Sequence, residues 1–440
     1  MKNQIIITGG KSLHGTIKPQ GAKNEALQIL SAVLVYPGKT RVDNIPDIAD
    51  VTKLIEILKY LGVEVEKVSS GCMIFDASRV DPDKMDTNRF RELASSLRGS
   101  LMVAGAMLGR FKKAFIPTPG GDKIGIRPIT THLRGFQSLG AYEIGGQNYV
   151  MDQDFRRPAR IQLTEASVTG TANILLASVF SQNSQPPLEI YNAACEPYVQ
   201  QLCGLLQKYG AQISGIGSNL LTVTPVTLKG VTDVEHVIQS DMIEVGSLIV
   251  LAVVCGNGIF IEGDDILQVL GETAQTVFKK LGVIWEERGG GLYIPAHQSY
   301  LIKEPSVQGK VRVVYDQIWP GLSPDHISHL IVLALFAKGS VVFEQRMFDE
   351  RLHFTSILRD MGASVHSSTN KQVVIMGNNR QTQLVGLEMS SPDIRAGMSL
   401  LIAALAAREK SIIHNAYQIH RGYENIVQRL RDLGAEIEER

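Results

Sequence analysis

The sequence predicts an α/β protein of two domains, each built from three repeated units with a buried helix and surrounding sheets. Three observations support this prediction. An amphipathic stretch that ends in glycine recurs six times, six further stretches are apolar on every side, and strand-like runs follow these stretches. At 440 residues the chain is also too long for one ordinary hydrophobic core.

The amphipathic stretches end in an apolar residue followed by glycine, and most carry Lys or Arg in the last turn. Glycine in that place is a helix stop signal, because it enters the left-handed backbone region without a steric penalty. The stop positions are separated by 78, 70, 72, 80 and 72 residues, which indicates one repeat of about 73 residues. They are Gly62, Gly140, Gly210, Gly282, Gly362 and Gly434.

Each repeat also contains a helix pattern that is hydrophobic almost all round. A helix of that kind is buried on every side, so one per repeat predicts three central helices in each domain. Strand-like runs such as 256–261 and 339–343 follow most of them. The six stretches are 25–35, 97–108, 172–180, 243–255, 327–336 and 396–407.

Composition limits the classes of function. The chain has 44 basic and 44 acidic residues, so its charge does not suggest a nucleic-acid or polyanionic-membrane partner. No apolar run reaches the ~18 residues of a membrane span, and the N-terminus begins with a strand pattern rather than a signal peptide. The four scattered cysteines form no CxxC motif, which favours reduced thiols in a cytoplasmic protein.

The most suggestive polar residues lie at the N-terminal ends of the predicted buried helices. Helix N-termini offer unpaired N–H groups and a positive dipole end, which suit phosphate or carboxylate. Helix capping is an equally good explanation for Asp241. It does not explain Lys23, Arg98 or Arg395, because a cation there opposes the helix dipole unless an anion joins it. The pattern predicts an anion site assembled from several repeats.

A glycine-rich segment at 119–128 (PGGDKIGIRP) adds an acid and two cations, Asp122, Lys123 and Arg127. Such a loop suits proton transfer beside an anionic substrate, although a solvated turn is the alternative for this segment alone. We expect neither a metal nor another cofactor, because His326 and His329 have no evident third ligand. Six cations are candidates for an anionic substrate: Lys23, Arg98, Arg127, Arg351, Arg395 and Arg421.

These motifs resemble those of the enolpyruvyl transferases, in order along essentially the whole chain. The resemblance is strongest to the branch that uses UDP-N-acetylglucosamine at the first committed step of peptidoglycan synthesis. The matching stretches are 21–24 (GAKN), 96–98 (SLR), 119–122 (PGGD), 127–128 (RP), 167–168 (SV), 192–197 (NAACEP), Asp241, 319–325 (WPGLSPD), 393–396 (DIRA) and 421–423 (RGY).

The resemblance implies two inside-out α/β barrels of three repeats each. In that family the N-terminal strand joins the second domain. The implied first domain is therefore 21–239, which carries the catalytic loop, and the second consists of 1–20 with 240–440.

The implied reaction moves the enolpyruvyl group of phosphoenolpyruvate to the sugar 3-hydroxyl and releases phosphate. It needs protonation of the enol carbon, deprotonation of the hydroxyl, and cations around phosphate and carboxylate. By position, Asp122 would protonate the enol carbon and Asp325 would act as the base. Lys23, Arg127 and Arg421 would hold phosphoenolpyruvate.

The resemblance also implies a set of binding residues. Asn24 would lie beside phosphoenolpyruvate. Arg351, Asp393 and Arg395 would belong to the second domain and meet the first on closure. The sugar nucleotide would be lined by Arg98, Arg127, Pro128, Ile129, Thr130, Thr131, Glu165, Ala166, Ser167, Val168, Asp325 and Met347.

Three positions depart from the family pattern. Many members carry Cys at the position of Asp122, and that thiol is alkylated by the epoxide fosfomycin. An ordinary Asp has a pKa of about 3.9 against about 8.5 for Cys, so Asp122 needs a raised pKa to act as an acid near neutrality. Glu165 replaces a common Lys and Tyr198 a frequent Glu, which bears on nucleotide binding.

Two alternatives remain open. The first is the same reaction on another acceptor, such as 3-phosphoshikimate, against which the 21–24 and 119–122 motifs count. The second is a non-catalytic nucleotide-sugar sensor. A sensor would have lost its proton-transfer residues, yet Asp122 and Asp325 are both present.

Overall fold

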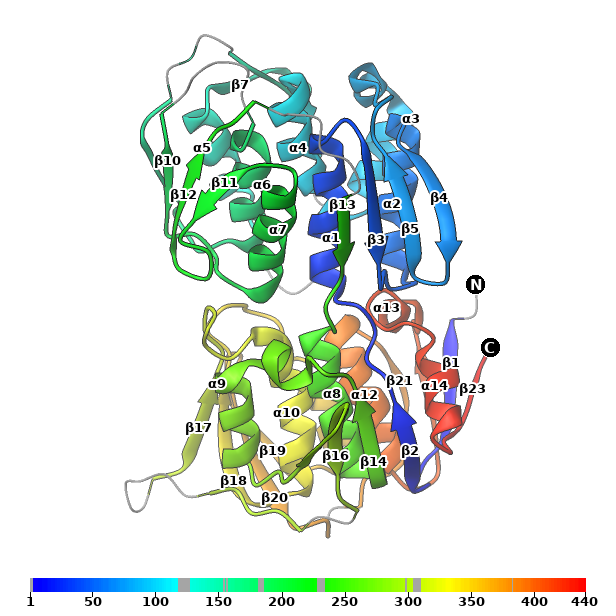
Figure 1. Ribbon diagram of the computed structural model, residues 1–440. Coiled ribbons are helices and arrows are strands. Elements are labelled where there is room, and N and C mark those ends of the chain that lie inside the picture. Colours follow the sequence, from blue (N-terminus) through cyan, green and yellow to red (C-terminus); the bar gives the residue numbers. More distant parts are fainter. Residues whose placement is uncertain are drawn as a thin grey trace. The chain divides into compact units, whose positions relative to one another are not determined.

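The computed structural model describes residues 3–117, 127–152, 155, 157–180, 186–227, 234–296, 299–303, 310–381 and 383–440. The chain forms two compact α/β units (Figure 1). The N-terminal unit consists of Gly21–Gly121 and Arg127–Gln239, and the C-terminal unit contains Met1–Gln20 and Ser240–Arg440. Within the described ranges, no helix has both the length and the apolar character that crossing a membrane requires.

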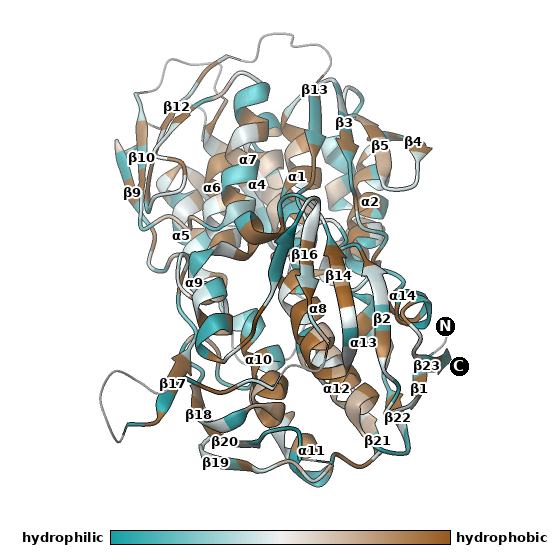
Figure 2. Cartoon of the chain, turned by 60° about the horizontal axis from the view of Figure 1, so that its bottom comes forward, coloured by the Kyte–Doolittle hydropathy of each residue, from teal (hydrophilic) through white to brown (hydrophobic). Residues whose placement is uncertain are grey.

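Three helices in each unit are almost completely buried, as the apolar stretches predict. All fourteen residues of α8 are buried, and Figure 2 shows much of α8 and α12 in the brown of hydrophobic residues. The N-terminal unit contains α1 (Lys23–Ala32), α4 (Leu101–Phe111) and α6 (Val168–Ser178). The C-terminal unit contains α8 (Met242–Cys255), α10 (Pro324–Phe336) and α12 (Ile394–Ala406).

Two of these helices begin four residues from the predicted position, and the other four begin one to three residues early. Helix α6 begins four residues earlier, because Ser167 caps it by accepting a hydrogen bond from the Gly170 N–H at 3.2 Å. Helix α4 begins four residues later, because Arg98–Ser100 forms a 3-10 turn before it. In both cases a local hydrogen-bonding choice, rather than hydrophobicity, sets the first residue of the helix.

The six predicted stop glycines confirm the amphipathic repeat. All six have φ between 90° and 104°, in the left-handed region. The helices before them are α2 (Ala49–Leu61), α5 (Thr130–Ser138), α7 (Pro197–Lys208), α9 (Ile266–Lys280), α11 (Thr355–Asp360) and α14 (Ile426–Asp432). Short helical segments outside this series are η1 (Val33–Val35), η2 (Pro82–Asp86), α3 (Asn88–Ser95) and α13 (Tyr417–His420).

Three sheets of the N-terminal unit lie within its described residues. The two four-stranded sheets share one pattern, in which a parallel pair is followed by two antiparallel pairs. Their orders are β13 (Val234–Val237), β3 (Lys39–Asp43), β5 (Cys72–Asp76), β4 (Glu64–Ser69), and β9 (Arg160–Gln162), β10 (Leu188–Tyr191), β12 (Leu220–Thr224), β11 (Gln212–Ser214). The third sheet is β6 (Lys113–Phe115), β8 (Asn148–Met151), β7 (Ala141–Gly145).

The C-terminal unit repeats the four-stranded pattern three times. Strands β1 and β2 come from the start of the chain, so the N-terminal residues complete two of its sheets. The orders are β21 (Glu388–Ser390), β22 (Lys410–His414), β1 (Gln4–Thr8), β23 (Glu436–Glu439); β2 (Leu13–Ile17), β14 (Gly256–Glu262), β16 (Gly291–Ile294), β15 (Glu286–Arg288); and β17 (Arg312–Tyr315), β18 (Lys338–Glu344), β20 (Gln372–Asn378), β19 (Val365–Thr369).

The packing of α4 against α6 depends on a glycine. A Cβ atom at Gly105 of α4 would lie 2.5 Å from Asn173 Oδ1 and 2.6 Å from the Asn173 carbonyl oxygen. The buried Asn173 side chain joins the two helices, because it accepts from the Gly105 N–H at 2.9 Å and donates to the Leu101 carbonyl at 3.0 Å. The position of Gly105 therefore has room for a hydrogen atom but not for a side chain.

We predict that Gly105→Ala lowers the free energy of unfolding by about 1–3 kcal/mol, because the added methyl group pushes α4 away from α6. The control is Gly204→Ala on α7, where an added Cβ has nothing within 4 Å. That change should raise the free energy by about 0.5–1 kcal/mol through helix propensity. Urea unfolding followed by circular dichroism measures both, and equal midpoints for the two variants would contradict the packing argument.

Candidate functional site

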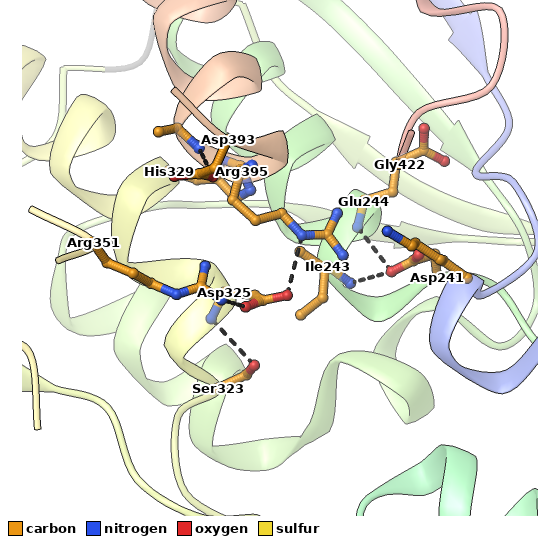
Figure 3. A network of polar contacts seen from close by, with 12 residues as sticks. Asp241, Ile243, Glu244, Ser323, Asp325, His329, Arg351, Asp393, Arg395 and Gly422 are labelled. Carbon is orange, nitrogen blue, oxygen red and sulfur yellow. Dashed lines mark hydrogen bonds and ion pairs between the residues drawn. The ribbon is translucent and has the colours of Figure 1, made fainter. Parts of the chain in front are cut away.

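The candidate site of the C-terminal unit is centred on Asp325, in the first turn of α10. The Ser323 hydroxyl caps this helix by accepting from the Asp325 N–H at 3.4 Å. Asp325 Oδ1 lies 2.6 Å from an Nη atom of Arg351, and Oδ2 lies 3.1 Å from Arg395 Nε (Figure 3). The carboxylate is thus held between two guanidinium groups.

This arrangement controls the charge of Asp325. Burial alone would raise the pKa of its carboxyl group, but Arg351 and Arg395 outweigh burial and hold that pKa well below its usual range. Both arginines are themselves buried, with exposed fractions of 8% and 4%. Arg351 Nε and Arg395 Nη1 have no hydrogen-bond partner in the described part of the chain. Because an unpartnered buried donor costs free energy, an anionic group at these atoms would be stabilised.

A chain of buried polar groups supports Arg395. Its guanidinium carbon lies 5.4 Å from the centre of the Tyr423 ring. The Tyr423 hydroxyl is 3.3 Å from His329 Nε2, and His329 Nδ1 is 2.8 Å from Ser399 Oγ. Burial keeps the pKa of His329 well below its ordinary value, so this imidazole is neutral at physiological pH and suits hydrogen bonding on both sides. The contact between Tyr423 and His329 could not be read from the sequence, because it joins two repeats.

Two predicted site residues are helix caps in the structure. Asp393 Oδ1 accepts from the Arg395 N–H at 2.7 Å and from the Ala396 N–H at 3.0 Å. Asp241 Oδ1 accepts from the Ile243 N–H at 2.8 Å and the Glu244 N–H at 3.3 Å. Capping, one of the two explanations given for Asp241, is therefore observed (Figure 3). Asp325, by contrast, has both of its carboxylate oxygens paired with guanidinium groups.

The two other predicted residues of this unit lie in irregular segments. Arg421 is buried, and one of its Nη atoms donates to Gln418 Oε1 at 2.8 Å. Met347 has an exposed fraction of 40%, and its N–H donates to Asp316 Oδ2 at 3.1 Å. The exposed Met347 side chain is therefore available to a ligand, whereas its backbone is fixed.

In the N-terminal unit, the cation at the start of α1 has a protein partner that the sequence analysis missed. Lys23 Nζ lies 2.7 Å from Asp50 Oδ2, and both side chains are buried. Asp50 lies in the first turn of α2, where an acid is common for dipole reasons alone, so it attracted no attention. The structure corrects the argument that Lys23 at a helix N-terminus requires a bound anion, because Asp50 already supplies a negative charge.

A second group in this unit surrounds Arg98. An Nη atom of Arg98 donates to the Arg127 carbonyl at 3.1 Å, and burial, assisted by the charge of Arg127, lowers the pKa of Arg98 to about 10. Thr131 Oγ1 lies 2.8 Å from Thr164 Oγ1 and donates to Glu165 Oε1 at 3.2 Å. The structure thus joins Arg98 to Arg127 and Thr131 to Glu165, each through one hydrogen bond.

The remaining predicted residues of this unit lie around these two groups. Asn24, Ile129, Ala166, Ser167 and Val168 are partly exposed, and Pro128 and Thr130 are exposed. Their exposure makes them accessible to a ligand. Asp122 and the rest of segment 118–126 lie outside the described residues.

Glu196 is a further residue of the N-terminal unit with unusual surroundings. Its exposed fraction is 8%, and its Oε2 atom has no hydrogen-bond partner within the described ranges. Burial raises the pKa of its carboxyl group to about 7, although N–H groups of Cys195 and Glu196 itself oppose the shift. The Glu196-Pro197 motif was noted in the sequence, but burial at the start of α7 could not be read from it.

We predict that Glu196→Gln makes the protein less sensitive to pH. The folded carboxyl group has a pKa of about 7 against an ordinary value of 4.5, so the folded state binds a proton more tightly. The contribution of this group to wild-type stability then falls as pH rises from about 4.5 to about 7. The glutamine variant lacks this loss and should gain about 3 kcal/mol relative to wild type across that window. Urea unfolding at pH 5 and pH 8 tests this.

The matched control for that experiment is Glu66→Gln on β4, where the side chain is exposed. Its stability should follow that of the wild type at both pH values. A constant difference between Glu196→Gln and wild type from pH 5 to pH 8 would show that Glu196 keeps its charge in the folded protein.

Comparison with known proteins finds similarity over nearly the whole chain. A family model described as EPSP synthase (3-phosphoshikimate 1-carboxyvinyltransferase) matches residues 7–430. Three curated relatives carry the name UDP-N-acetylglucosamine 1-carboxyvinyltransferase. The protein of Bacteroides thetaiotaomicron is 45% identical over 98% of this chain and 99% of its own. That of Porphyromonas gingivalis is 44% identical over 98% of each chain, and that of Treponema denticola is 37% identical over 99% of each.

Solved structures share the fold at much lower sequence identity. The enolpyruvyl transferase NikO from Streptomyces tendae has a TM-score of 0.84 at 19% identity, over 100% of this chain and 99% of its own. An EPSP synthase from Acinetobacter baumannii has a TM-score of 0.70 at 16% identity, over 99% of each chain. These likenesses show a two-domain α/β fold, and at such identities they show the fold alone.

Proposed function

The chain belongs to the EPSP synthase family of carboxyvinyl (enolpyruvyl) transferases, and we propose that it transfers the enolpyruvyl group of phosphoenolpyruvate to the 3-hydroxyl of UDP-N-acetylglucosamine and releases phosphate. The names of relatives up to 45% identical over nearly their full length support this acceptor. The reaction would be the first committed step of peptidoglycan synthesis. The three buried helices and three sheets of each unit further support an inside-out α/β barrel.

The observation that carries the proposal is the cluster of Asp325 with the buried Arg351 and Arg395. It combines an ionised carboxylate, the state from which a base must start, with guanidinium N–H groups that lack partners among the described residues. Transfer of an enolpyruvyl group needs both features, because the acceptor hydroxyl loses a proton while the other substrate carries phosphate and carboxylate charges.

Asp325 would accept the proton of the sugar 3-hydroxyl. The arginines that keep it ionised also oppose its protonation, since they hold its pKa well below the usual range. Its basicity would increase if an anionic group of the substrate shared Arg351 and Arg395, because each cation would then act less strongly on the carboxylate. We therefore place the substrate anion beside these arginines during the reaction.

The other roles follow the family pattern. Asp122 would protonate the enol carbon. Lys23, Arg127 and Arg421, with Asn24 beside them, would hold phosphoenolpyruvate. The sugar-nucleotide site would include Arg98, Arg127, Pro128, Ile129, Thr130, Thr131, Glu165, Ala166, Ser167, Val168, Asp325 and Met347. Arg351, Asp393 and Arg395 would be further substrate-binding residues. Proximity of Arg98 to Arg127 and of Thr131 to Glu165 supports the nucleotide side.

We predict phosphate release from phosphoenolpyruvate with UDP-N-acetylglucosamine and none with 3-phosphoshikimate. Asp325→Asn and Asp122→Ala should each lower kcat by about 10²- to 10⁴-fold, the range lost with one proton-transfer group. Asp264→Asn, at an exposed position, should leave kcat unchanged. Release with 3-phosphoshikimate alone would move the chain to the other acceptor, and sugar-nucleotide binding without release would favour a sensor.

We also predict that fosfomycin leaves the wild-type protein unmodified, because an aspartate at position 122 is a poorer nucleophile toward an epoxide than a thiolate. The matched variant is Asp122→Cys, which should gain one adduct at that residue. Intact-mass spectrometry followed by peptide mapping distinguishes the two proteins. An adduct on Asp122 of the wild type would contradict this prediction.

A further inference from the structure

A buried carboxylate that the proposed reaction does not use lies where two parallel strands end. Strands β17 and β18 pair Tyr315 with Glu344 at their last residues. The next residue after Tyr315 is Asp316, whose exposed fraction is 1%. Its Oδ1 accepts from the Arg346 N–H at 2.6 Å, and its Oδ2 accepts from the Met347 N–H at 3.1 Å. Oδ2 also accepts from Gln345 Nε2 at 2.5 Å.

These bonds determine how the chain leaves strand β18. Segment 345–354 contains no helix or strand, so its N–H groups do not continue the parallel ladder. Asp316 replaces the missing strand partner for two consecutive N–H groups. The Arg346 side chain adds to this, because its guanidinium carbon lies 3.6 Å from the centre of the Tyr315 ring. The path of the segment after β18 therefore depends on the residues that end β17.

The segment after β18 carries Arg351, one of the two arginines that pair with Asp325. Arg351 follows Met347 by four residues, and its guanidinium lies 2.6 Å from Asp325. The arginine is buried and lies 4.9 Å from the Phe348 ring centre, so its position follows from the path of segment 345–351. A shift at Arg346 and Met347 would move Arg351 with it.

The segment that follows Asp316 leads to Asp325, the other member of the Asp325–Arg351 ion pair. The Gln317 N–H donates to the Leu322 carbonyl at 2.8 Å, which closes a turn directly after Asp316. Leu322 is buried, and the next residue, Ser323, caps the helix on which Asp325 lies. Asp316 therefore stands at the base of both loops that bring Asp325 and Arg351 together.

We propose that Asp316 is a positioning residue that fixes the Asp325–Arg351 pair and, through it, the geometry of the acceptor site. The inference rests on the proposed function for the identity of the acceptor. A purely structural role explains less, because an apolar side chain fills a core at lower cost than a buried charge. Three N–H donors converge on the two oxygens of one carboxylate, and a neutral amide has only one acceptor oxygen.

The test compares Asp316→Asn with Asp349→Asn, which changes an exposed carboxylate of the same segment that pairs with Lys371 at 2.6 Å. In Asp316→Asn the Gln345 amide can turn to face the new NH₂ group, which leaves the Met347 N–H without its acceptor. We expect kcat/KM for UDP-N-acetylglucosamine to fall by about 10- to 100-fold, the usual consequence of a misplaced reacting group. The KM for phosphoenolpyruvate should rise as well, because Arg351 would move away from the substrate anion that we place beside it.

A second readout does not require activity. Hydrogen exchange followed by mass spectrometry should show faster exchange of segments 317–325 and 345–351 in Asp316→Asn, by about 10-fold or more. Asp349→Asn should match the wild type in both measurements. If wild-type protein released no phosphate, the proposed function would fail, and faster exchange of both segments would still support Asp316 as the residue that positions them.

Two results would overturn the inference. One is unchanged exchange of both segments in Asp316→Asn. The other is faster exchange with unchanged kcat/KM in an active enzyme, because the segment would then move without affecting the site. If Asp316→Asn does not fold, Gln345→Met serves instead, since it removes one of the three donors and keeps both backbone bonds. Its kcat/KM should fall by about two- to fivefold, and no change would count against the inference.

Discussion

A carboxylate held between two buried guanidinium groups is the interaction on which the C-terminal unit depends. Asp325 comes from α10, Arg395 from α12 and Arg351 from the segment after β18. The Asp325–Arg395 pair therefore joins two repeats, whereas Arg351 belongs to the same repeat as Asp325. Removing charges from water is costly, and the attraction between them repays that cost only if their geometry is well fixed. The Tyr423–His329–Ser399 chain and the Asp316 carboxylate are the means by which the surrounding fold fixes it.

The repeated architecture explains how so polar a site fits into so apolar a core. The central helices are mostly apolar along their sides, and most of their charged residues lie near the N-terminal ends, where unpaired N–H groups need partners. Asp241 and Asp393 provide those partners in the C-terminal unit, and Ser167 does so in the N-terminal unit. Asp325 lies at an equivalent helix end, but Ser323 performs the capping, and the Asp325 carboxylate is left for the arginines.

The features that the sequence predicted well are those determined by neighbouring residues. The buried helices and the six stop glycines follow from hydrophobic periodicity and from the left-handed backbone that glycine favours, both of which act over a few residues. The sequence could nominate Asp325, Arg351 and Arg395, but it could not show that Asp50 pairs with Lys23 or that Asp316 holds the segment after β18. Those contacts depend on how helices and strands that are distant in the sequence pack together, and no local pattern encodes that.

The ion pairs also distinguish the carboxyl group of Asp325 from that of Glu196. Arg351 and Arg395 keep the pKa of Asp325 so low that this group stays charged throughout the physiological range unless a ligand draws the cations away. Glu196 has no ionic partner among its described contacts, and burial raises its pKa to about 7. Asp325 faces two guanidinium groups and Glu196 faces none in the described part of the chain, and this difference explains why Glu196 is the one of the two that responds to pH near neutrality.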